Sequence, residues 1–224
     1  MITTSQWRFT ALEFVVLWGT TRQDRLPFPF TWRAHVATAD ELAGQRAAAV
    51  RTTDDGLATA LNVLSNAELR VQTFGFVDGE PGAMLHAATV GSQAVVAKQE
   101  SDEIVVELMS SSDVIPRITL PPMAPGRERG GTVATSTNVM TDSNDDRHRL
   151  TRLLNRKRSG GGELLVGTST RADCCIDTIA GGFTWIDVEG DGRYLLTGTD
   201  PASVTPATDA AVTTSVTRYV IGTA

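Results

Sequence analysis

Glu68-Leu69-Arg70-Val71 and Glu163-Leu164-Leu165-Val166 are two similar stretches that decide how this chain folds. Each follows leucines at helical spacing, within 57–64 before the first stretch and within 150–154 before the second. Each also opens a segment with the composition of a β-strand. A helix followed by a strand therefore occurs twice, roughly ninety residues apart, which indicates an internal structural repeat.

The similarity continues beyond these stretches in the same order. Residues 93–97 match residues 183–187, and each segment is followed by an acidic turn. Residues 103–108 match residues 192–197. A chain built twice from helix, strand and hairpin is expected to form a scaffold with an internal two-fold relation.

Alternating apolar residues and turn signals predict a sheet that is mainly antiparallel. Asp78-Gly79 and Asp191-Gly192 are hairpin signals, because such turns require positive φ. The alternation slips within 68–77, where Leu69 and Val71 share one parity and Phe74 and Phe76 the other, which indicates a bulge. Strands are expected at about 68–77, 84–90, 94–99, 103–108, 163–169, 174–179, 183–188 and 193–198.

Capping signals predict where the helices begin. Thr10-x-x-Glu13 and Thr38-x-x-Glu41 are capping boxes, so helices are expected from these points to about residues 18 and 50. Thr205-Pro206 predicts the start of a last helix. Gly160-Gly161-Gly162 follows a helix and precedes a strand, and it is interpreted as a helix stop and flexible connection.

The length and composition predict one globular domain over residues 1–224. Its internal halves are expected at about 1–120 and 130–224, joined by a proline- and glycine-rich linker at 116–131.

The composition also favours a cytoplasmic protein. The first eight residues lack the charged and apolar regions of a secretory signal, and the apolar run at 14–18 is too short to cross a bilayer. Cys174 and Cys175 are adjacent in a predicted strand, so their side chains would point to opposite faces and cannot form a disulfide framework.

Motifs of catalysis and metal binding are not found in the sequence. The three histidines, His35, His86 and His148, have no ligand spacing. Asp187-x-Glu189-x-Asp191-Gly192 resembles the start of a calcium loop, but the twelfth position is Gly198 where glutamate is needed, so a hairpin turn is the better interpretation. We expect a protein that is not an enzyme, with no catalytic residue, cofactor or metal.

A basic helix is predicted over 147–158, with acidic residues at its start and basic residues toward its end. Nucleic-acid binding through this helix is one interpretation. A solvated or partner-facing helix is the other, and it is favoured by the formal net charge of −6 and the lack of aromatic residues nearby.

The ordered pattern resembles the EspG family of actinobacterial type VII secretion chaperones. The resemblance spans nearly the whole chain and rests on Thr10-Ala11-Leu12-Glu13-Phe14 with Leu17-Trp18, Leu26-Pro27-Phe28-Pro29-Phe30, Asn66-Ala67-Glu68-Leu69-Arg70-Val71, Val95-Val96-Ala97, Gly161-Gly162-Glu163-Leu164, Phe183-Thr184-Trp185-Ile186-Asp187 and Gly192-Arg193-Tyr194-Leu195. It implies an α+β fold with quasi-two-fold symmetry and a central, mainly antiparallel sheet flanked by helices.

The resemblance further implies a cytosolic chaperone that binds a secreted helical substrate of the PE–PPE kind and keeps it soluble for export. The secretion machinery is a second expected partner, whereas nucleic acid and membrane are not. Only one clear helix follows Pro206, so the C-terminal helical bundle is expected to be reduced.

The second half of the chain is our predicted contact surface for a partner. Trp185 and Tyr194 are its aromatic candidates, with Arg156 and Arg158 as charges at the rim. Core packing is the alternative for the two aromatic residues. A small-molecule enzyme with a site between the repeats, or a nucleic-acid binder using helix 147–158, are the alternative functions.

Overall fold

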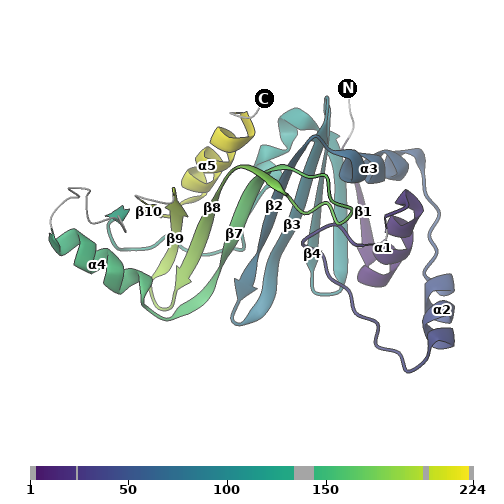
Figure 1. Cartoon of the computed structure of the whole chain (residues 1–224), viewed down its shortest axis with the longest axis horizontal. Coiled ribbons are helices and arrows are strands. Elements are labelled where there is room, and N and C mark those ends of the chain that lie inside the picture. The colour runs from purple at the N-terminus through teal and green to yellow at the C-terminus, as the bar shows by residue number, and fades with distance from the viewer. Residues whose placement is uncertain (1–3, 24, 134–143, 199–201, 222–224) are drawn as a thin grey trace.

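The strands of the described residues form a ten-stranded sheet (Figure 1). The structure is a computed structural model that describes residues 4–23, 25–133, 144–198 and 202–221. The strands are β1 (Ser5–Thr10), β2 (Leu69–Val77), β3 (Glu80–Val90), β4 (Gln93–Glu100), β5 (Glu103–Ser110), β6 (Gly131–Val133), β7 (Arg158–Thr168), β8 (Thr178–Val188), β9 (Gly192–Thr197) and β10 (Ala202–Pro206). The helices are α1 (Ala11–Trp18), α2 (Ala39–Ala48), α3 (Asp55–Asn66), α4 (Asn144–Leu154) and α5 (Asp209–Ile221).

The strand order confirms the repeated unit, but the expected matches of 93–97 with 183–187 and of 103–108 with 192–197 are wrong, because each is one strand out of step. The order reads β1-β5-β4-β3-β2 on one side of the middle and β7-β8-β9-β10-β6 on the other, so each strand of the first half has a counterpart five strands later. The halves meet where β2 pairs antiparallel with β7, and Val71 lies directly opposite Val166. These are the last residues of the two similar stretches, so a local two-fold axis passes through this pair. The expected α+β class with an antiparallel central sheet and flanking helices is confirmed.

The two faces of the sheet carry different cores. Successive side chains of a strand project to opposite faces of the sheet, so Gln72 and Val71 define two faces that we call the Gln72 face and the Val71 face. Side chains of residues paired across neighbouring strands project to the same face. On the Gln72 face, α1 and α3 cover β3–β5 at one end, and α4 covers Ile186 and Tyr194 at the other end. On the Val71 face, α5 packs over the middle of the sheet, against Trp185 and its neighbours. Along the described segments, no helix is long and apolar enough to cross a membrane.

Several predicted local features are confirmed. Thr10 and Glu13 form the expected reciprocal capping box of α1. A register shift lies between Thr73 and Gly75, where the bulge is expected, but its extra residue is in β3, and β2 pairs with β7 without interruption. Asp78 and Gly79 turn the β2–β3 hairpin with φ of 52° and 87°.

The predicted connection at Gly160-Gly161-Gly162 is wrong, because all three glycines lie inside β7. A Cβ at Gly162 would stand 2.3 Å from the carbonyl oxygen of Phe74 and 2.4 Å from the Trp185 ring. At Gly75, on the facing strand, a Cβ would stand 2.8 Å from the same ring. The glycines therefore leave room for a tryptophan to lie across the junction of the two halves.

Other differences concern the ends of elements. The predicted strand 174–179 begins only at Thr178, and Cys174 and Cys175 lie in the preceding loop. Pro206 ends β10, and the last helix begins at Asp209, where the Thr208 hydroxyl accepts a hydrogen bond from the Ala211 amide. The basic helix ends at 154, and strands 5–10, 131–133 and 202–206 had no expected counterpart.

Arg70, a buried arginine of β2, joins α3 to the sheet, and its hydrogen-bond partners are carbonyl oxygens and a histidine instead of a carboxylate. Arg70 donates from its guanidinium to the carbonyl oxygens of Leu64 and Ser65, at 2.6 and 3.2 Å, so its charge meets the negative end of the α3 dipole. It also lies 3.1 Å from Nε2 of His86. Arginine can only donate, so His86 accepts at Nε2 and its Nδ1 donates to the Phe28 carbonyl at 2.7 Å. His86 is therefore neutral in the fold, and burial together with Arg70 lowers its pKa to about 3.

We expect His86 to make the fold sensitive to acid. Its pKa lies below the ordinary 6.5, so its contribution to stability is present above pH 6.5 and is lost as the pH falls toward 3. The loss is at most about 1.4 kcal/mol per pH unit. In urea unfolding between pH 7 and 4, H86Q should therefore show a shallower fall in unfolding free energy than the parent, whereas H35Q, at an exposed position, should follow the parent curve. Identical slopes for H86Q and the parent would contradict this assignment.

The glycines where β2 pairs with β7, a junction that we call the seam, give a second prediction. G162A should lower the free energy of unfolding by about 1–3 kcal/mol, because the added methyl group overlaps the Phe74 carbonyl and the Trp185 ring. The control is G44A within α2, where a Cβ meets nothing within 4 Å. It should raise the unfolding free energy by about 0.5–1 kcal/mol. Equal effects of the two substitutions would mean that the seam does not require glycine.

Candidate functional site: the open centre of the Gln72 face

Four paired residues form a row across the middle of the sheet. Phe74 in β2 lies opposite Glu163 in β7, Glu163 opposite Thr184 in β8, and Thr184 opposite Leu196 in β9. All four belong to the Gln72 face, since the same strands place Gln72 opposite Leu165. Figure 1 shows β2 and β7 in the middle of the molecule, with α3 toward one end and α4 toward the other. The row lies between the two helical covers of this face, and its last member, Leu196, packs against the edge of the core beneath α4.

Apolar side chains surround the row and remain accessible. Phe76 is 39% exposed, and its ring lies across Gly161 on the facing strand. Phe74 is half-buried and makes an edge-to-face contact with Phe28, with ring centroids 5.0 Å apart. We call the group the central strip and define it by its residues: Phe74, Phe76, Glu163, Leu165, Thr184 and Leu196.

Glu163 is the charged residue of the central strip. Its side chain is exposed, and within the described ranges it has no ion pair and no side-chain hydrogen bond. The other five members are apolar or carry a neutral hydroxyl. The strip is therefore an apolar surface with one isolated carboxylate near its middle.

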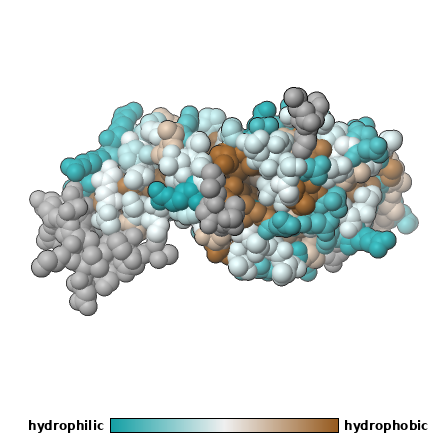
Figure 2. All heavy atoms as spheres, turned by 90° about the horizontal axis from the view of Figure 1, so that it is seen from above, coloured by the Kyte–Doolittle hydropathy of each residue, from teal (hydrophilic) through white to brown (hydrophobic). Residues whose placement is uncertain are grey.

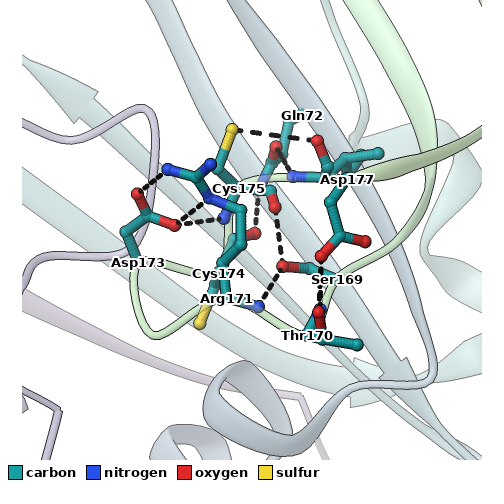
Figure 3. Close-up of polar contacts among 9 residues, drawn as sticks. Gln72, Ser169, Thr170, Arg171, Asp173, Cys174, Cys175 and Asp177 are labelled. Carbon is teal, nitrogen blue, oxygen red and sulfur yellow. Dashed lines mark hydrogen bonds and ion pairs between the residues drawn. The ribbon is translucent and has the colours of Figure 1, made fainter.

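The loop at 169–177 lies at one end of the strip and is fixed to the sheet (Figure 3). The Gln72 amide donates to the Cys174 carbonyl at 2.6 Å and accepts from the Ile176 amide at 3.0 Å. Within the loop, Arg171 holds Asp173 through two bonds of 2.9 and 2.8 Å, which lowers the pKa of Asp173 to about 2. The loop belongs to the second half, yet Cys174 is buried in the core of the first half. It therefore ties the two halves together beside the strip.

The opposite end of the strip is fixed by the linker and α4. Tyr194 accepts from the Glu128 amide at 2.8 Å and donates to Asp191 Oδ2 at 3.0 Å. Arg156 binds the same oxygen at 2.8 Å and Glu128 at 3.2 Å. Tyr194 and Arg156, two of the four predicted contact residues, therefore lie close together. The partner that they share is Asp191 of this chain, not a residue of a client.

Trp185 and Tyr194 are both fully buried in the free chain, which favours the alternative of core packing for the two aromatic residues. Trp185 faces the opposite side of the sheet, where the Arg193 guanidinium lies 5.9 Å from its ring centroid. Tyr194 lies in the small core beneath α4. Arg158 is exposed at the start of β7 and donates to the Leu154 carbonyl at 3.1 Å, so it remains available at the rim together with Arg156.

The central strip itself was not predicted as a site. Its signal in the sequence is the parity of Phe74 and Phe76, which regular alternation along β2 places on the face opposite Val71. Glu163 is the first residue of a repeated stretch, and that position gives no sign that its carboxylate is exposed and unpaired. Which face would lack a helix depends on where α4 and α5 pack, and strand periodicity carries no information on that.

A groove of about 1000 Å³ lies on the Val71 face between the halves. Most of its walls are apolar, and Met123 is 38% exposed there. Among its described lining residues, the buried ionisable one is Arg193, and this cation is bound to Asp187 at 2.6 and 2.8 Å. Arg193 also donates to the Pro121 carbonyl and so fixes the linker that forms one wall.

Other kinds of site have little support in the described part of the chain. There, no three His, Cys, Asp or Glu side chains gather in a way that could hold a metal ion. The basic residues around α4 are partly neutralised: Lys157 pairs with Glu189 at 2.8 Å, and Arg156 is held as described above.

Seen from above, hydrophobic residues gather near the middle of the molecule (Figure 2).

Comparison with known proteins gives one result for the family and one for the fold. No curated protein matches the chain. The type VII secretion system chaperone EspG5 of Mycobacterium tuberculosis, solved in complex with the PE25-PPE41 dimer, has a similar structure, with a TM-score of 0.61 and 14% sequence identity. The superposition covers 96% of this chain and 96% of that chain, so the whole fold is shared. The sequence profile of the EspG family matches residues 10–218, and the chain therefore belongs to the EspG family.

Proposed function

We propose that this protein is a type VII secretion chaperone that binds a helical client of the PE–PPE kind in the cytoplasm and keeps it soluble for export. The observation that carries the proposal is the family match over 10–218, together with a fold shared from end to end with a chaperone solved in complex with a PE–PPE dimer. The protein acts by binding and performs no chemistry on its client. The secretion machinery is the proposed second partner.

The central strip is the proposed docking surface for the client. It offers apolar side chains that are accessible without any rearrangement of the core, as a surface for an aggregation-prone apolar tip requires. Its two ends are held by the 169–177 loop and by the contacts around Asp191, so the surface is ordered before binding. Arg156 and Arg158 are the proposed rim charges at the α4 end.

The chain acts as one domain in this proposal. Residues 1–120 and 130–224 form its halves, and the β2–β7 pairing makes their sheets continuous. A client that lies across β2, β7, β8 and β9 would touch both halves. Binding would therefore stabilise the junction as well as the client.

Co-expression with each PE–PPE-like gene pair of the same genome tests the function. At least one pair should be insoluble alone, and should elute with this protein as a single complex in size-exclusion chromatography. F76D should abolish that complex, because it places a charge in the apolar strip without touching the core. The thermal midpoint of F76D alone should stay near that of the parent.

The matched control is M123D, since Met123 has nearly the same exposure but lies in the groove on the other face. It should leave the complex intact. The proposed function is wrong if the parent protein forms a complex with none of the pairs. Loss of the complex in M123D, with F76D unaffected, would instead move the docking surface to the groove.

A further inference from the structure

Glu163 restricts the chemistry of any client segment that binds the central strip. It sits inside the row, with Phe74 on one neighbouring strand and Thr184 on the other. In the free protein its carboxylate is exposed to water and needs no partner. A client that covered Phe74 and Leu196 would also cover Glu163, because the three residues lie on one line across adjacent strands.

Covering this carboxylate with an apolar surface is unfavourable. A charge removed from water must be paired and hydrogen-bonded, or its burial opposes binding. Within the described residues, no cation of this chain reaches Glu163, so the compensating charge has to come from the bound molecule. The rest of the strip is apolar or hydroxylic, so the residues that flank the cation have to be apolar.

The dimensions of the row fit a helix. Four adjacent strands, spaced about 4.8 Å apart, give a row of about 14 Å, which corresponds to about ten residues or nearly three turns of helix. Phe74 is one strand from Glu163, and Leu196 is two strands away on the other side. A helix lying along the row would therefore place an apolar residue about one turn before the cation and another about two turns after it.

We propose that the client docks on the central strip with a helix that carries a lysine or arginine between apolar residues, and that this cation pairs with Glu163. The inference rests on the proposed function and deepens it by stating the chemistry of the docking segment. It also predicts which molecules are rejected: a helix with an acidic or uncharged residue at that position leaves Glu163 buried and unpaired.

The test compares dissociation constants for the PE–PPE-like dimer that co-purifies with the parent protein. E163Q keeps the size and shape of the side chain but removes its charge, and E163K reverses the charge. We expect E163Q to weaken binding by at least about tenfold and E163K to weaken it further. The parent should also lose affinity as salt is raised, and E163Q should lose less over the same range.

The matched control is E103Q. Glu103 is also exposed on a strand, but it pairs with Arg8 at the far end of the sheet. This variant should bind the dimer like the parent. Thermal unfolding of each variant alone verifies that the fold is unchanged.

Parent-like binding by both E163Q and E163K would overturn the inference and leave the proposed function in place. Tighter binding by E163Q would overturn it too, since it would show a carboxylate buried without a partner. If the parent binds no PE–PPE-like dimer, the proposed function fails and the inference fails with it.

Discussion

The pairing of β2 with β7 is the interaction on which the rest of the structure depends. It turns two five-stranded units into one sheet and places Val71 opposite Val166 on a local two-fold axis. Close approach at this junction requires glycine, because Trp185 occupies the space that side chains at 75 and 162 would fill. The largest aromatic residue near the seam is therefore used for packing between the halves, and it is not available for contact with a partner.

This arrangement explains why the centre of one face stays open. The leucine-bearing helices α3 and α4 belong to equivalent places in the two units, so the two-fold relation sets them at opposite ends of the Gln72 face. The middle of the Val71 face receives α5 instead. The central strip is thus a consequence of the repeat, and its apolar residues are accessible where the two helical covers do not reach.

Much of the architecture could be predicted from the sequence, because repeated leucine stripes, capping boxes and hairpin signals are local features. The Asp78-Gly79 turn and the capping box at Thr10 are examples. The prediction failed where distant residues decide the outcome. Gly160-Gly161-Gly162 has the composition of a connection, but its conformation follows from the neighbouring strands and the Trp185 ring. For the same reason Trp185 and Tyr194 could not be assigned to the core or the surface from their own segments.

Hydroxyl-radical footprinting can show which face of the sheet binds the client, because Phe76 and Met123 are 39% and 38% exposed on opposite faces. Both side chains should be oxidised in the free protein, and mass spectrometry reports each one separately. A client bound on the central strip should protect Phe76 and leave Met123 as reactive as before. Protection of Met123 with Phe76 unchanged would place the client on the other face of the sheet.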